Sequence, residues 1–127
     1  MHPDAEVRVP ADTAYVAVVR MATAAIAARL DFTLDDIEDL RMAVGEACAL
    51  TLNGAAPGGS LEAAFHLSPD RIEVHVSADT SRDTPPDPAS FAWQVLTSTA
   101  EDVSGDLADG RVVVRLAVSR NAAATTV

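Results

Sequence analysis

The stretch DLRMAVGEACALTL, residues 39–52, decides how this chain of 127 residues folds. Its apolar residues recur at helical spacing, which predicts a helix with one side suited to packing on a sheet. That side consists of Ile37, Leu40, Val44, Ala47, Cys48 and Thr51. The stretch therefore predicts a helix-on-sheet fold, and it places an acid, Glu46, outside the packing stripe.

The opposite side of this helix carries Met42, Glu46, Leu50 and Asn53. A helix that is apolar on two sides is usually covered on both. We therefore expect another helix, a ligand or a partner to lie against Glu46, where a carboxylate would suit a general base. The alternative is that Glu46 reaches solvent or pairs with a nearby arginine.

Local signals predict the remaining elements. Thr33, followed by Asp36, is typical of a helix N-cap, and Gly54 is a typical stop after Asn53. The other expected elements are a strand at residues 6–9, a helix from Asp12 or Thr13 to about Leu30, strands at 61–67 and 71–78, a loop at 79–88, a helix at 89–103, a turn around Gly105–Gly110 and a strand at 111–119.

The two central strands are expected to pair as a hairpin through the turn SPDR, residues 68–71. This register places only apolar side chains on one face. The expected pairs are Leu67 with Ile72, Phe65 with Val74 and Ala63 with Val76. The fold class is therefore α/β, a two-layer α/β sandwich with a mostly antiparallel sheet and helices on one face. Residues 1–120 form a single domain in this prediction, and residues 121–127 form a flexible tail.

The composition is strongly acidic. The chain has 19 acidic and 9 basic residues and a formal net charge of −10. This charge disfavours nucleic acid and anionic membranes and favours a basic partner, although it could also serve solubility alone. The N-terminus lacks an apolar signal segment, no stretch is suited to spanning a membrane, and the single Cys48 cannot form an internal disulfide. These features together predict a cytoplasmic protein.

Residues 39–52 resemble the asparagine-box helix of the GHKL, or Bergerat-like, superfamily of ATPases, and more closely the bacterial anti-sigma-factor serine kinases. Their helix is similar to DLRLAVDEACTNAI. The matching positions are Asp39, Leu40, Arg41, Ala43, Val44, Glu46, Ala47 and Cys48. The order of the expected elements agrees as well, and residues 90–103 resemble the actinobacterial branch of these proteins. The resemblance implies a histidine-kinase-like ATPase fold.

The resemblance also implies roles for single residues. Glu46 matches the general base, and Asp79 matches an aspartate that contacts adenine at the end of a strand. The asparagine that holds magnesium is replaced by Leu50, which offers no oxygen to a hard cation. Neither glycine motif is present, because residues 80–83 contain no glycine and residues 90–93 are Ser, Phe, Ala and Trp. We therefore expect Glu46 to be a vestigial base, with no metal site, no required cofactor and little or no kinase activity.

The leading hypothesis is thus an anti-sigma factor that sequesters an alternative sigma factor and is antagonised by an anti-anti-sigma protein of the STAS type. By the same resemblance the protein would be a homodimer, and Arg20 would contact the sigma factor; the alternative for Arg20 is a solvated arginine. The alternative function is an active serine kinase that uses ATP and magnesium to phosphorylate the anti-anti-sigma protein.

Seven further residues have simpler interpretations. The pair His66 and His75 lies on the polar face of the hairpin, where exposed strand residues are expected rather than zinc ligands. Cys48 is expected in the core, and Phe91 and Trp93 are either core residues or contact anchors. Turn positions beside prolines are expected for Asp83 and Asp87.

Overall fold

The structure is a computed structural model that describes residues 2–120, and the predicted tail at 121–127 lies outside the described residues. Its elements in chain order are β1 (Ala5–Pro10), a 3₁₀ turn η1 (Thr13–Tyr15), α1 (Val16–Arg29), α2 (Leu34–Leu52), β2 (Ser60–Ser68), β3 (Arg71–Asp79), α3 (Phe91–Thr99), β4 (Glu101–Ala108) and β5 (Arg111–Ser119). Among the described residues, no helix is both long enough and apolar enough to cross a membrane.

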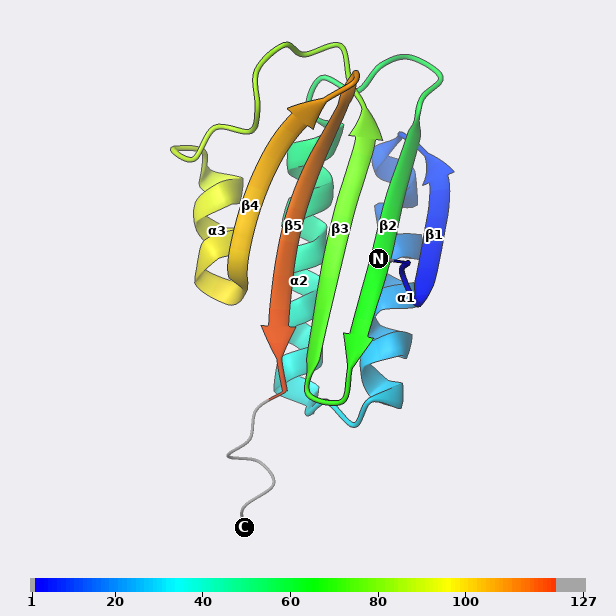
Figure 1. Cartoon of the computed structure of the whole chain (residues 1–127), viewed down its shortest axis with the longest axis vertical. Helices are drawn as coiled ribbons and strands as arrows, with labels where there is room; N and C mark the ends of the chain where they lie inside the picture. The colour runs from blue at the N-terminus through cyan, green and yellow to red at the C-terminus, as the bar shows by residue number, and fades with distance from the viewer. Residues whose placement is uncertain (1, 121–127) are drawn as a thin grey trace.

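The strands form one five-stranded sheet in the order β1-β2-β3-β5-β4, and every neighbouring pair is antiparallel. All three α-helices lie on one face of this sheet, and the other face is open (Figure 1). The predicted class, an α/β sandwich with an antiparallel sheet and helices on one face, is confirmed.

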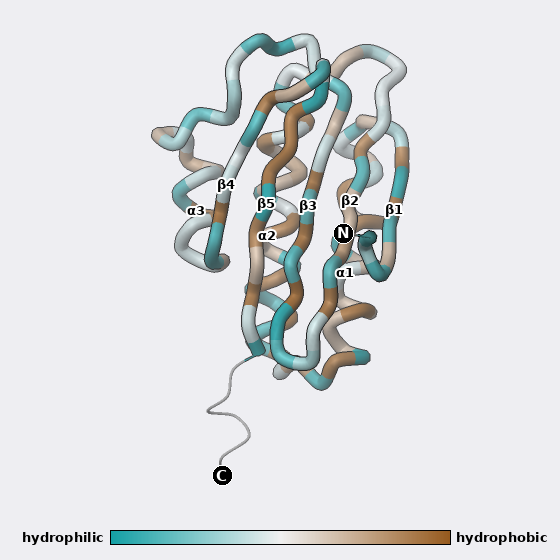
Figure 2. The backbone as a smooth tube through the Cα atoms, viewed as in Figure 1, coloured by the Kyte–Doolittle hydropathy of each residue, from teal (hydrophilic) through white to brown (hydrophobic). Residues whose placement is uncertain are grey.

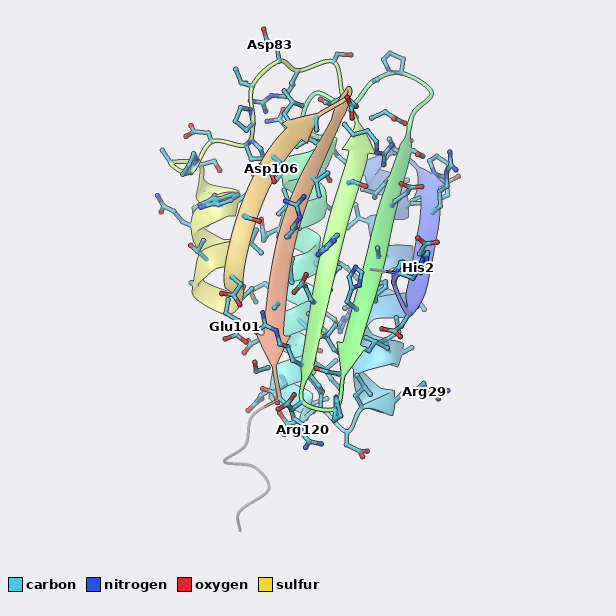
Figure 3. All side chains as sticks on the ribbon, viewed as in Figure 1. His2, Arg29, Asp83, Glu101, Asp106 and Arg120 are labelled. Atoms are coloured by element: carbon cyan, nitrogen blue, oxygen red, sulfur yellow. The ribbon has the colours of Figure 1, made fainter. Side chains whose placement is uncertain are left out.

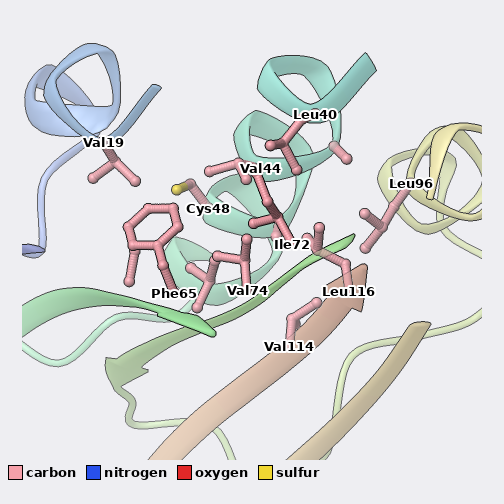
Figure 4. Packing of buried hydrophobic residues seen from close by; sticks show 14 of the residues in the cluster. Val19, Leu40, Val44, Cys48, Phe65, Ile72, Val74, Leu96, Val114 and Leu116 are labelled. Atoms are coloured by element: carbon pink, nitrogen blue, oxygen red, sulfur yellow. The ribbon is translucent and has the colours of Figure 1, made fainter. Parts of the chain in front are cut away.

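Helix α2 forms the centre of the helical layer, as the sequence predicts. The Thr33 hydroxyl accepts a hydrogen bond from the Asp36 amide at 3.1 Å and caps the first turn. At the other end, Asn53 is the C-cap and Gly54 adopts a positive φ of 84°. The buried side of α2 packs on β3 and β5, and Figure 4 shows Leu40, Val44 and Cys48 facing the strands.

The hairpin of β2 and β3 has the predicted register. The paired residues include Leu67 with Ile72, Phe65 with Val74, and Ala63 with Val76. Hydrophobic and hydrophilic residues alternate along these strands, as Figure 2 shows for β3 and β5. The buried half of the alternation contributes to the core, and the other half lies on the open face of the sheet.

The predicted helix at residues 89–103 was wrong after Thr99, and the predicted turn around Gly105–Gly110 was wrong except at its end. Helix α3 ends at Thr99, and β4 begins at Glu101. The strand pairs with β5 across a tight turn in which Asp109 and Gly110 both have positive φ, 52° and 74°. Asp-Gly favours this hairpin turn, and its geometry requires a strand on each side. The pairing outweighs the weak helical pattern that continues to Val103.

Candidate functional site

Glu46 lies at a cleft over the outer side of α1 and α2. The cleft has a volume of about 270 Å³. Its lining consists of Val16, Arg20, Glu38, Arg41, Met42, Gly45 and Glu46. Glu46 itself is half-buried, and among the described residues its carboxylate makes neither a hydrogen bond nor an ion pair. The acid predicted from the sequence is therefore free to meet a ligand or partner.

Two arginines border the same cleft. The Nε atoms of Arg20 and Arg41 are both buried and have no hydrogen-bond partner among the described residues. The Arg41 guanidinium also donates to Glu38 at 2.9 Å, whereas Arg20 has no such carboxylate. An unpaired buried donor costs on the order of 1–3 kcal/mol. The Arg20 side chain passes over Gly45. A Cβ added to Gly45 would lie 3.5 Å from the Cδ atom of Arg20, which is an ordinary van der Waals contact. The cleft thus presents one unpaired cation and one unpaired anion.

Leu50 does not lie on the outer side of α2 that the helical wheel suggested. Its side chain is 8% exposed and belongs to the hydrophobic core. The reason is that α3 packs directly against α2 and adds a second covered side to the helix. Leu96, on α3, is fully buried in the same core and is visible beside Leu40 and Leu116 in Figure 4.

Asp79 lies on the open face of the sheet, away from α2. Its carboxylate accepts hydrogen bonds from the Ser60 amide at 2.9 Å and from the Arg111 guanidinium at 2.7 Å. The Ser60 amide, helped by Arg111, holds the pKa of Asp79 below its ordinary value of 3.8. Arg111 also donates to Glu62 at 2.9 Å and to Ser77 at 3.0 Å. Asp79 is thus one member of a polar network that ties β2, β3 and β5 together.

The structure therefore brings Glu46 and Arg20 to one cleft and keeps Asp79 apart. The residues before Asp79 explain this, since Val74, Val76 and Ala78 point to the core and the intervening side chains point to the open face. Whether Asp79 contacts an adenine stays a prediction. Asp79 is not among the residues that line the cleft beside Glu46.

The chain has Leu50 at the position where the resemblance implies a magnesium-binding asparagine. Magnesium is held by oxygen ligands in a near-octahedral arrangement, and the side chain of Leu50 is buried hydrocarbon. The Asp79 oxygens are already engaged by Ser60 and Arg111.

Comparison with known proteins identifies the family. The family model described as the histidine kinase-like ATPase domain matches residues 9–92. The chain belongs to this family. The matched range begins at the end of β1, includes all of α1, α2 and the central hairpin, and ends in the first turn of α3. The fold and the helix that carries Glu46 are therefore those of a histidine kinase-like ATPase domain.

The relatives are similar over part of their length. A serine-protein kinase RsbW from Halalkalibacterium halodurans is 45% identical over 73 residues, which cover 57% of this chain and 45% of that protein. The RsbW of Bacillus velezensis is 39% identical over 75 residues, or 57% of this chain and 47% of that protein. The chain thus spans less than half the length of these curated relatives.

Solved structures share the fold. The RsbU and RsbW domains of Rv1364c from Mycobacterium tuberculosis match with a TM-score of 0.66 and 16% identity, covering 94% of this chain and 34% of that one. The mycobacterial sensor histidine kinase MprB matches with a TM-score of 0.55 and 11% identity, covering 91% of this chain and 99% of that one. At these identities the likeness concerns architecture.

The remaining sequence candidates have clear positions. The rings of His66 and His75 lie 4.6 Å apart on the open face, and His75 contacts Glu73 at 2.6 Å. Cys48 is buried, and burial raises the pKa of its thiol from 9.0 to about 12 against a smaller opposing effect of Arg20. Phe91 is 79% exposed at the start of α3, so it is not a core residue. Trp93 is half-buried and packs against the core.

Two turn positions were also predicted. Asp87 lies in the segment before α3, where its carboxylate accepts a hydrogen bond from the Ala89 amide at 2.9 Å. Asp83 is exposed in the same connection and is labelled in Figure 3. Both positions are consistent with turn residues in a proline-rich loop.

Sequence reasoning missed the roles of Arg41 and Arg111. The sequence pattern indicates Arg41 only as a match to the family helix and Arg111 only as the first residue of a strand. Their partners lie on neighbouring turns or strands, so only the spacing of Glu38 before Arg41 was available as a signal. The open face carries more such pairs, including Arg115 with Asp106, the latter labelled on β4 in Figure 3.

Proposed function

We propose that this protein is an anti-sigma factor that sequesters an alternative sigma factor without needing nucleotide, and that an anti-anti-sigma protein of the STAS type releases it. The similarity to curated relatives named serine-protein kinase RsbW supports the proposal. The observation that carries it is Leu50, buried where the family resemblance implies a magnesium-binding asparagine. A scaffold that keeps the family fold and lacks that oxygen is suited to binding rather than phosphoryl transfer.

Arg20 supports a docking role for the outer face of α1. Arg20 lines the cleft and forms no ion pair with a described carboxylate, so its guanidinium is available to a carboxylate of a bound protein. The net charge of −10 favours a partner with a basic surface and disfavours direct contact with nucleic acid. A homodimer and a cytoplasmic location are part of the proposal through the resemblance alone.

The second candidate is an active serine kinase that phosphorylates the anti-anti-sigma protein with ATP and magnesium. The names of the relatives favour it, and so does Glu46, whose unpaired carboxylate is available to accept a proton from a hydroxyl. In this case one of the remaining acids or Asn53 would have to replace the missing metal ligand.

Two measurements distinguish the candidates. Co-purification from the native cell identifies the sigma factor, and calorimetric titration then measures its binding to the recombinant chain. A second titration, with ATP and magnesium, tests nucleotide binding. Tight sigma-factor binding without nucleotide heat is the expected result. Magnesium-dependent ATP binding that is lost in Glu46→Gln, together with phosphorylation of a STAS protein, would instead establish the kinase.

A further inference from the structure

The cleft between α1 and α2 contains charges that the protein does not satisfy itself. Four of its lining residues are charged, and Glu38 and Arg41 neutralise each other at 2.9 Å. The other two, Arg20 and Glu46, are not within ion-pair distance of each other or of any other described side chain. The free protein therefore leaves one guanidinium and one carboxylate, both half-buried, at a single site.

The rest of the lining is suited to contact with a side chain. Val16 and Met42 contribute the apolar part, and Met42 is 48% exposed. An exposed methionine beside charged groups is adaptable, because its unbranched thioether can repack against different surfaces. Gly45 has no side chain to fill the space beneath Arg20. The cleft has a volume of about 270 Å³, which is space for side chains of a bound protein.

We propose that Glu46 is a docking residue: it accepts a lysine or arginine side chain of the sequestered protein, next to an acidic side chain of the same partner on Arg20. This inference rests on the proposed function. It gives Glu46, the residue that matches the catalytic base of the family, a role in partner recognition. Both unpaired charges are then neutralised in one step, and the partner's aliphatic stem covers Met42. The excess negative charge of the chain favours the approach of a basic side chain.

The test uses the full chain and the sigma factor identified by co-purification. Glu46→Gln keeps the shape of the side chain and removes its charge, so we expect the dissociation constant to rise about tenfold, with a weaker dependence on salt. The matched control is Glu6→Gln, the same change at an exposed position on the open side of the sheet, and its dissociation constant should stay within about twofold of the wild type. Thermal unfolding of both variants confirms that they are folded.

A charge exchange completes the experiment. Glu46→Lys should abolish most of the binding, and replacing the facing basic residue of the sigma factor by glutamate should restore part of it. Unchanged affinity of Glu46→Gln, together with weakened binding of Arg20→Ala, would overturn the role of Glu46 and leave the proposed anti-sigma function intact. Failure of the unmodified chain to bind the sigma factor would overturn the proposed function, and this inference with it.

Discussion

Leu50→Asn tests the interpretation of the site with a single substitution, because it installs the amide that the family resemblance implies one turn after Glu46. Leu50 is 8% exposed and packs in the core. Replacing it forfeits about 1.5–3 kcal/mol of hydrophobic burial. It also buries an amide that lacks a partner, at a further cost of about 1–3 kcal/mol. We therefore expect the free energy of unfolding to fall by about 3–5 kcal/mol.

The assay is urea unfolding followed by circular dichroism, with Leu34→Asn as the matched control. Leu34 lies on the same helix and is 76% exposed, so the same change of side chain should cost less than about 0.5–1 kcal/mol there. A domain of this size has a total stability of about 5–15 kcal/mol, so the difference between the two variants is readily measured.

The same variant is then titrated with ATP and magnesium. We expect no binding, because Asp79 remains on the other face of the sheet and the glycine motifs remain absent. If Leu50→Asn were as stable as Leu34→Asn and bound nucleotide in a magnesium-dependent way, the side chain at position 50 would line an open site. The argument from a buried leucine would then be wrong.

Three other predictions concern stability and reactivity. Asp79→Asn should lower stability at neutral pH and make little difference in strong acid. Ser60 and Arg111 depress the pKa of Asp79 in the folded state below the ordinary value of 3.8. The charged carboxylate therefore stabilises the fold at pH values above 3.8, and this stabilisation is lost as the pH falls through the folded-state pKa. Gly110→Ala should lower the free energy of unfolding by about 1–2 kcal/mol, measured by urea unfolding, because φ is 74° at this position. The added Cβ would have no atom within 4 Å, so the cost comes from the backbone conformation and not from a clash. Cys48 should resist iodoacetamide in the native protein and react in guanidinium chloride, measured by mass spectrometry, because burial raises its pKa to about 12.

Each of these has a result that would contradict it. A stability difference between wild type and Asp79→Asn that is the same at all pH values would show that the carboxylate charge is not what the network uses. A neutral Gly110→Ala would mean that the turn can adopt another conformation. Rapid alkylation of native Cys48 would require α2 to separate from the sheet frequently.

The elements with strong local signals were predictable from the sequence. The Thr33 cap, the stripe of α2 and the alternation in the central hairpin all act within a few residues, and the structure reproduces each of them. Strand β4 was missed because it consists mostly of glycine, serine and acids and has a single β-branched residue, Val103. The Asp109–Gly110 pair was the available signal, since this dipeptide is typical of two-residue hairpin turns.

The site was predictable only in part. Glu46 and Arg20 were found, but their meeting at one cleft depends on how α1 packs against α2, which no local pattern specifies. The side of the sheet on which Asp79 lies was predictable from the sequence. Asp79 has the same parity as Glu73, His75 and Ser77 on the polar side of the strand, and that alternation places it on the open face. The position of Leu50 depended on α3, a helix whose docking is set by tertiary packing.

The two outer strands of the sheet have a consequence for self-association. Edge strands expose unpaired backbone groups that can recruit a further strand and seed aggregates. Here β4 carries Glu101, Asp102 and Asp106 and an irregular register beside Asp102, and β1 ends in Pro10. The carboxylates of Glu101 and Asp102 pair with Arg71 and that of Asp106 with Arg115, so charged side chains held by ion pairs line this edge. The charges and the irregular register of β4 and the proline at the end of β1 therefore disfavour growth into a continuous intermolecular sheet.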